Sequence, residues 1–122
     1  MDKTKTILIV EDEIILSTCL KMELENEGFC VCGSLTTGEE AVEFVNETKP
    51  DVILMDINLV GKIDGIEAVE VITEKSTIPI IYMTGYDKLE IYERAQKTNP
   101  IAYLIKPVEI WNLKPILESV FN

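Results

Sequence analysis

The chain contains no histidine among its 122 residues. This absence excludes a serine–histidine catalytic pair, a histidine-ligated zinc site and a phosphohistidine on this chain. The three cysteines, Cys19, Cys30 and Cys32, are few and odd in number, which is typical of reduced thiols. Cys30 and Cys32 could place two thiols on one strand face for a metal, but further ligands are lacking. We therefore expect them to be small core residues.

Long hydrophobic runs and an excess of positive charge are also missing. No apolar run approaches the ~20 residues that a membrane-spanning helix requires. The first residues have neither the apolar stretch nor the cleavage site of a signal peptide, so we expect a cytoplasmic location. The net charge of −11 argues against direct contact with nucleic acid or with an anionic membrane.

Strand-like apolar runs alternate with helical stripes along the whole chain. The strands are predicted over 7–10, 29–33, 52–55, 80–83 and 101–105. Helices are predicted over 13–27, from Thr37, from Asp64, over 87–97 and over 109–120. This alternation with short connections predicts one α/β domain over residues 1–122, in which helices cover both faces of a parallel sheet.

Several helix ends carry local signals. Gly28 supplies a left-handed stop after the first helix, and Thr37 with Glu40 has the spacing of a capping box. Asp64 is the expected N-cap of the third helix. Pro115 conflicts with the last helix, so we expect either a kink there or a helix that begins near Asn112.

Carboxylates follow two of the predicted strands. Asp56 ends an apolar run and is the only charged residue between positions 52 and 60. If the first and third strands are neighbours, Glu11, Asp12 and Asp56 converge, and two carboxylates about 4 Å apart repel by roughly 4 kcal/mol at an effective dielectric of about 20. Their oxygen ligands favour Mg²⁺, with Mn²⁺ as the alternative. The competing interpretation is solvated loop charge, since the chain has 22 acidic residues.

A lysine and a threonine follow the fifth and fourth strands. A lysine at position 106, beside an acidic metal site, indicates that a second anion binds there. A phosphoryl group attached to a carboxylate is an anion that fits this pattern. Lys106 would neutralise the phosphoryl oxygens while the Thr84 hydroxyl donates to one of them.

Four segments, ILIVEDE, VILMDINL, IIYMTGYD and AYLIKP, together resemble the receiver domains of response regulators, the CheY-like modules of two-component signalling. The resemblance extends over about residues 5–121. It implies a flavodoxin-like, doubly wound (βα)5 fold with the sheet order 2-1-3-4-5. It also implies a phosphorylation-dependent signalling switch rather than an enzyme with an external substrate.

The resemblance assigns roles to the strand-end residues. Asp56 would be the phosphoacceptor, and Lys106 would bind the phosphoryl group beside a cis peptide to Pro107. The Mg²⁺ ligands would be Asp12, Asp56, the backbone carbonyl of Asn58 and, through water, Glu11. Thr84 and Tyr103 would form the switch that reshapes the surface of the 87–97 helix, the 101–105 strand and the last helix.

The implied partners are a sensor histidine kinase or phosphotransfer protein as donor and an unknown downstream protein as target. A dimer through the switch surface is the further expectation. The 57–64 loop lacks the family's usual proline and is one residue longer than its common pattern. Asn58 and Tyr86 would modulate access to the site, with Tyr86 shielding the acyl phosphate from water.

Three other interpretations differ in their sequence requirements. The chain could be a receiver taken from a larger regulator or hybrid kinase. A haloacid-dehalogenase-like phosphatase is disfavoured, because its nucleophile would follow the first strand in a D-x-D-x-T pattern. A flavin-binding flavodoxin is disfavoured because Glu11, Asp12 and Glu13 would repel the flavin phosphate.

Overall fold

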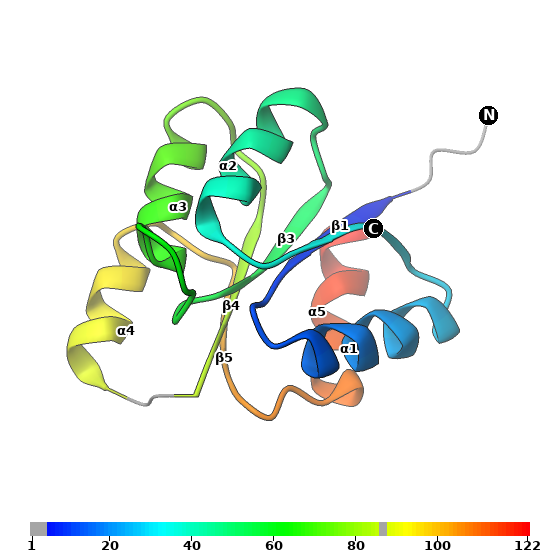
Figure 1. The fold of residues 1–122 in the computed structure, drawn as a ribbon. Helices are drawn as coiled ribbons and strands as arrows, with labels where there is room; N and C mark the ends of the chain where they lie inside the picture. Colours follow the sequence, from blue (N-terminus) through cyan, green and yellow to red (C-terminus); the bar gives the residue numbers. More distant parts are fainter. Residues whose placement is uncertain (1–4, 86–87) are drawn as a thin grey trace.

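The computed structural model describes residues 5–85 and 88–122 (Figure 1). Its strands are β1 (Thr6–Val10), β2 (Cys30–Leu35), β3 (Val52–Asp56), β4 (Ile80–Thr84) and β5 (Ala102–Ile105). Its helices are α1 (Ile14–Asn26), α2 (Gly38–Glu47), α3 (Gly65–Thr73), α4 (Leu89–Gln96) and α5 (Ile110–Phe121). All neighbouring strands pair in parallel, and the order β2-β1-β3-β4-β5 confirms the predicted sheet.

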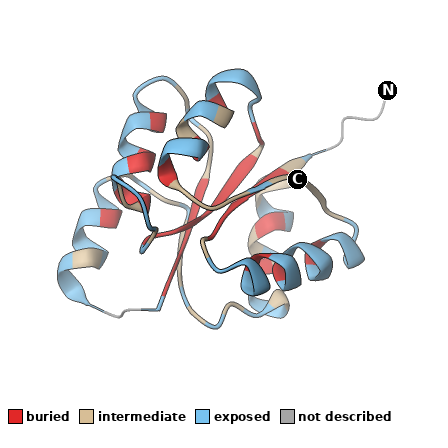
Figure 2. Cartoon of the chain, viewed as in Figure 1, coloured by how far each residue is buried: buried red, intermediate tan, exposed pale blue. Residues whose placement is uncertain are grey.

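Helices α2, α3 and α4 cover one face of the sheet, and α1 and α5 cover the other (Figure 1). The first layer packs on the sheet through residues such as Val45, Val69 and Ala95. The second packs through residues such as Leu24 and Leu117. The three central strands are consequently buried along nearly their whole length, as Figure 2 shows. Within the described residues, no helix has the length and apolar character needed to cross a membrane.

The predicted caps are present. Thr37 and Glu40 form a reciprocal capping box at the start of α2, and Asp64 and Glu67 form another at the start of α3. Gly28 has a φ angle of 94°, a left-handed conformation that glycine adopts without a Cβ clash. These local signals set the boundaries of α2 and α3, and they fix where the chain turns back toward the sheet.

The observed boundaries lie within two residues of the predicted ones, and β2 and α5 are informative. Strand β2 continues to Leu35 because its backbone pairs with β1 as far as Val10, although Gly33 and Ser34 interrupt the apolar pattern. Helix α5 agrees with the predicted helix over 109–120 and includes Pro115, so the alternative start near Asn112 is wrong, whereas the alternative of a kink at Pro115 stays a prediction. Pro115 is the sixth of the twelve residues of α5, so it removes a main-chain hydrogen bond inside the helix and crowds the carbonyl of Trp111, a cost that packing of the helix offsets.

Both cysteines of β2 are partly buried, and Cys32 is the one that packs against the core. The Sγ of Cys32 lies 3.5 Å from the carbonyl oxygen of Ile7. Burial raises the pKa of the Cys32 thiol above its usual value. In the described part of the chain, no cluster of metal-ligating side chains includes a cysteine.

Candidate functional site

The carboxyl ends of four neighbouring strands meet at one edge of the sheet. Asp56 is the last residue of β3, and Thr84 is the last residue of β4. Glu11 directly follows β1, and Lys106 directly follows β5. Because the strands are parallel, the polar side chains at their ends gather at a single edge, where open α/β sheets bind ligands.

Three carboxylates form a compact cluster at this edge. One oxygen from each of Glu11, Asp12 and Asp56 lies within 4.8 Å of the others. Glu11 and Asp56 are each only 2% exposed, whereas Asp12 is half-buried. The predicted convergence is therefore observed, and the two buried carboxylates need positive charge or hydrogen-bond donors nearby.

Lys106 provides the positive charge inside the protein. Its Nζ lies 2.6 Å from Oε1 of Glu11 and donates a hydrogen bond to Oδ2 of Asp56 at 3.1 Å. Burial opposes the charge of this ammonium, but the hydrogen bond to Glu11 and the charge of Asp56 prevail and raise the pKa of Lys106. The side chain therefore remains protonated at neutral pH, and it bridges the two buried carboxylates.

Backbone amides satisfy the other oxygens of these carboxylates. The N–H of Asn58 donates to Oδ1 of Asp56 at 3.1 Å, and the N–H of Glu13 donates to Oε2 of Glu11 at 3.1 Å. Each buried carboxylate thus has one oxygen facing Lys106 and the other facing a main-chain donor. This arrangement fixes the orientation of both groups before any ligand arrives.

The start of α3 approaches the backbone of Asp56 very closely. A Cβ added at Gly65 would lie 2.1 Å from the carbonyl oxygen of Asp56. The N–H of Gly65 also donates to the carbonyl oxygen of Ile57 at 2.9 Å. Only glycine allows this approach, so Gly65 helps to define where Asp56 emerges from the sheet.

Thr84 and Tyr103 occupy neighbouring strands. Thr84 is fully buried, and its carbonyl oxygen accepts a hydrogen bond of 2.7 Å from the N–H of Lys106. The Tyr103 ring makes edge contacts with Tyr82 and Tyr92, at centroid distances of 6.4 and 5.1 Å. The threonine thus lies beside the lysine, and the tyrosine contacts α4 through Tyr92.

Other predicted site features have mixed outcomes. The peptide bond between Lys106 and Pro107 is cis, as the resemblance implied. Asn58 is exposed and follows Asp56 by two residues, so its carbonyl remains the predicted ligand. Tyr86 lies outside the described residues.

The carboxylate cluster fits a hard divalent cation. Every donor in it is an oxygen, and Mg²⁺ prefers one or two carboxylates together with several waters. Glu11, Asp12 and Asp56 are the residues that would hold the ion, directly or through water. A dication here would also relieve the repulsion among the three negative charges.

An apolar groove opens beside the site, between α1 and the segment after β5. It has a volume of about 340 Å³, with Glu11 and Lys106 at its border. Its walls include Leu16 and Cys19 from α1 and Val108. The start of α1 also exposes apolar side chains, with Ile15 79% exposed.

The contacts that hold the 57–64 loop in place were not predicted from the sequence. Glu39 of α2 accepts hydrogen bonds from two amides of this loop, Lys62 and Ile63. Arg94 of α4 forms a two-pronged pair with Asp64, with the closer nitrogen at 3.1 Å. Capping motifs are visible as spacings within one segment, but these contacts join distant segments and leave no local pattern.

A five-stranded parallel sheet in this order, with an acidic cluster, a threonine and a lysine at its carboxyl edge, defines a CheY-like receiver domain. The chain belongs to the response regulator receiver domain family, because the model of that family matches residues 7–118.

Individual relatives agree with this assignment. Transcriptional regulatory protein PdtaR of Mycobacterium tuberculosis is 36% identical over 114 residues, which cover 93% of this chain and 55% of that protein. Transcriptional regulatory protein ZraR of Escherichia coli is 35% identical over 114 residues, covering 93% of this chain and 25% of its own length. The chain thus spans about half the length or less of these curated relatives.

Solved structures show the same fold. The signal receiver domain of a modulated diguanylate cyclase from Desulfovibrio desulfuricans superposes with a TM-score of 0.89 and 36% identity, covering 97% of this chain and 94% of that one. A CheY-like receiver domain protein from Methanospirillum hungatei gives a TM-score of 0.86 and 28% identity, covering 98% and 95%.

Proposed function

We propose that this receiver domain is a phosphorylation-dependent switch in which Asp56 accepts a phosphoryl group from a histidine kinase or phosphotransfer protein. One observation carries the proposal. The Asp56 carboxylate lies in a cluster of three carboxylates within 4.8 Å and also contacts the Lys106 ammonium at 3.1 Å. A nucleophilic oxygen between a dication site and a fixed ammonium is the arrangement that phosphoryl transfer requires.

The chain's own residues have separate tasks in the transfer. An oxygen of Asp56 attacks the phosphorus atom of the donor, and the new O–P bond forms as the bond from phosphorus to the donor's leaving atom breaks. The leaving group keeps the electron pair of that bond. Lys106 moves its hydrogen bond from Asp56 to a phosphoryl oxygen, and the Thr84 hydroxyl donates to another.

Receiver domains typically bind Mg²⁺, and the carboxylate cluster suits it. When bound, Mg²⁺ supplies the charge neutralisation that a phosphoryl group beside three carboxylates demands. Asp12 and Asp56 would hold it directly, the Asn58 carbonyl would be a further ligand, and Glu11 would contribute through water. Glu11 also keeps its hydrogen bond to Lys106, which keeps the ammonium near the transferred group.

The apolar groove between α1 and the segment after β5 is the contact surface for the phosphodonor protein. It borders Lys106, and the exposed apolar side chains of Ile15 and Leu16 lie at the start of the helix beside it. An exposed apolar patch rimmed by polar residues is typical of protein–protein contact sites. A helix carrying the phosphohistidine can lie along this groove and present its phosphoryl group to Asp56.

Phosphorylation then changes a second surface, formed by α4, β5 and α5. Thr84 is drawn toward the phosphoryl group, and Tyr103 moves into the space that it leaves. Because Tyr103 packs against Tyr92 of α4, this motion reaches a face that exposes apolar side chains. The downstream target binds to this face.

The test is a phosphorylation assay on the purified chain with acetyl phosphate as donor. We expect the intact mass to increase by one phosphoryl group in the presence of Mg²⁺. Neither chelation of Mg²⁺ nor the Asp56→Asn variant should give this increase. Equal phosphorylation of the parent and of Asp56→Asn would refute the assignment of the acceptor.

A further inference from the structure

The loop between β3 and α3 leaves the site and returns to the same place. It begins after Asp56 and ends at Gly65, whose N–H donates to the carbonyl oxygen of Ile57 at 2.9 Å. The base of the loop is therefore closed beside the phosphoacceptor. Asn58 lies in the outgoing half, and its N–H donates to Oδ1 of Asp56. A displacement of this loop that reaches its outgoing half changes the position of Asn58 relative to Asp56.

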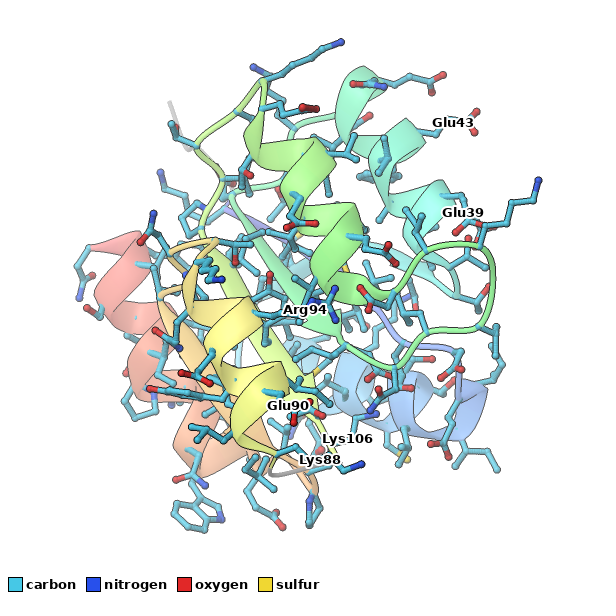
Figure 3. The ribbon with its side chains drawn as sticks, turned by 90° about the vertical axis from the view of Figure 1, so that its left-hand side faces the viewer. Glu39, Glu43, Lys88, Glu90, Arg94 and Lys106 are labelled. Atoms are coloured by element: carbon cyan, nitrogen blue, oxygen red, sulfur yellow. The ribbon has the colours of Figure 1, made fainter. Side chains whose placement is uncertain are left out.

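The returning half of the loop rests on the first turn of α2. Oε2 of Glu39 accepts a hydrogen bond from the N–H of Lys62 at 3.3 Å, and Oε1 accepts one from the N–H of Ile63 at 3.4 Å. Each oxygen of the Glu39 carboxylate therefore accepts a hydrogen bond from a different amide. Figure 3 shows Glu39 on the side of α2 that faces this loop.

Two glycines make room for this contact. Gly61 has a φ angle of 115°, and a Cβ there would lie 2.9 Å from Oε2 of Glu39. A Cβ on Gly38, the first residue of α2, would lie 3.0 Å from Cγ1 of Ile63. The loop and the helix start therefore fit together closely at both the backbone and the side-chain level.

We propose that Glu39 is a positioning residue for the metal site, which acts by fixing the 57–64 loop and therefore the Asn58 carbonyl. The proposal rests on the proposed function, because it concerns the same site. It adds α2, which supplies none of the predicted site residues, to the elements that determine Mg²⁺ affinity. The extra loop residue gives a reason for this support, since a longer loop has more conformations to exclude.

The charge of Glu39 agrees with this role. Hydrogen bonding from the Lys62 amide lowers the pKa of the Glu39 carboxyl below its usual value, so the group is ionised at neutral pH. Charged acceptors form the stronger hydrogen bonds with amides. Glutamine is an informative replacement, because its side chain offers one oxygen acceptor where two amides need an oxygen each.

Glu43 provides a matched control. It lies one turn further along α2, carries the same charge and is exposed, as Figure 3 shows. Among the described residues it has no hydrogen bond or ion pair, so Glu43→Gln removes the same charge from the same helix without releasing the loop.

The experiment compares the parent, Glu39→Gln and Glu43→Gln in two measurements. Amide hydrogen exchange should become faster at Lys62 and Ile63 in Glu39→Gln alone, without a change in the core strands. Calorimetric titration with Mg²⁺ should show an affinity weakened about tenfold in Glu39→Gln, as expected when support of a metal ligand is lost. Glu43→Gln should match the parent in both.

Comparing the Mg²⁺ requirement with the rate at saturating Mg²⁺ distinguishes a positioning role from general destabilisation. In the acetyl phosphate assay, Glu39→Gln should need about tenfold more Mg²⁺ for half-maximal phosphorylation. Its rate at saturating Mg²⁺ should stay within about twofold of the parent rate, because Asp56, Lys106 and Thr84 are unchanged.

Each outcome decides the question. Faster loop exchange with unchanged Mg²⁺ affinity, or weaker affinity with unchanged exchange, overturns the role of Glu39. An equal loss in Glu43→Gln assigns the effect to net charge and also overturns it. If the parent itself neither binds Mg²⁺ nor accepts a phosphoryl group, the proposed function fails, whereas a competent parent with an unaffected Glu39→Gln refutes only this inference.

Discussion

Lys106 determines the electrostatics of the site at the scale of single residues. Its ammonium lies within 3.1 Å of both buried carboxylates, Glu11 and Asp56. Removing it leaves two negative charges facing each other with only main-chain donors as compensation. We therefore expect Lys106 to matter for stability as well as for the proposed phosphoryl transfer.

We predict that Lys106→Met lowers the free energy of unfolding by about 1–3 kcal/mol without Mg²⁺, because buried charged acceptors lose their donor. Saturating Mg²⁺ should reduce this deficit, since the dication replaces the missing charge and binds only the folded site. Urea unfolding with and without Mg²⁺ measures both quantities. Lys114→Met, which removes the exposed pair with Glu27, should cause a much smaller loss that Mg²⁺ does not change. A deficit in Lys106→Met that is independent of Mg²⁺ would contradict this account.

Tyr82 gives a prediction about pH. Burial raises its pKa from 10.0 to about 12, despite the hydrogen bond of its hydroxyl with Thr98. A raised pKa in the folded state means that the stability contributed by neutral Tyr82 is fully present below pH 10.0 and is lost as the pH rises toward 12.

Tyr82→Phe should therefore be less stable than the parent by about 1 kcal/mol at neutral pH, because the hydrogen bond is lost. Above pH 10.0 the difference should shrink, since phenylalanine does not ionise. Urea unfolding at a series of alkaline pH values gives the comparison, and a gap that stays constant across that range would disprove the raised pKa.

The residues that gather at the site could be predicted from the sequence better than the contacts that support them. Glu11, Asp12, Asp56 and Lys106 could be found because each follows an apolar strand, and strand ends meet in a parallel sheet. The hydrogen bonds that orient these side chains come from backbone amides, whose partners depend on loop conformation. They became visible only with the three-dimensional structure.

At the scale of elements, Asp64 has two roles that can be separated. It caps α3 through the N–H of Glu67 at 2.8 Å, and it pairs with Arg94 of α4 at 3.1 Å. The first contact is local, whereas the second joins two helices on the same face of the sheet. The two contacts are expected to contribute unequally.

Asp64→Asn should keep the cap and lose the ion pair, at a cost of less than about 1 kcal/mol, because the pair is partly exposed. Asp64→Ala should cost about 1–2 kcal/mol, since the cap is lost as well. Thermal unfolding of Asp64→Asn, Asp64→Ala and Arg94→Gln, each compared with the parent, measures these losses of stability. Equal losses in Asp64→Asn and Asp64→Ala would show that the ion pair, not the cap, dominates.

Element boundaries could be predicted where side chains set them. The capping boxes of α2 and α3 are encoded by residues three apart, and both are present. The end of β2 could not be predicted, because it depends on pairing with β1 through a register shift beside Leu8. The continuation of α5 through Pro115 also departs from local propensity, because its packing residues Leu113 and Leu117 are fully buried and hold the helix around the proline.

At the scale of the whole molecule, a second apolar surface is exposed besides the start of α1. Leu89 is 71% exposed and Trp111 69% exposed, and Tyr92 and Ile105 also face solvent on the α4, β5 and α5 surface. A net charge of −11 opposes association of two copies, so contact through this face should depend on both phosphorylation and salt.

We predict that the phosphorylated domain dimerises through this surface and that moderate salt favours the dimer. Leu89→Ser should raise the dissociation constant about tenfold or more, because a symmetric interface loses the side chain twice. Val71→Ser on α3 is the control and should leave association unchanged. Sedimentation equilibrium with and without phosphodonor gives the constants, and an equal effect of both variants would exclude this surface.

The chemical identity of the modified residue is the most direct test of the central claim, that a carboxylate held between a dication site and Lys106 accepts the phosphoryl group. Borohydride reduces an acyl phosphate of aspartate to homoserine. After incubation with acetyl phosphate and Mg²⁺, reduction and peptide mass spectrometry should find homoserine at position 56. Homoserine at another acidic position, or none in a protein that has gained a phosphoryl group, would contradict the account.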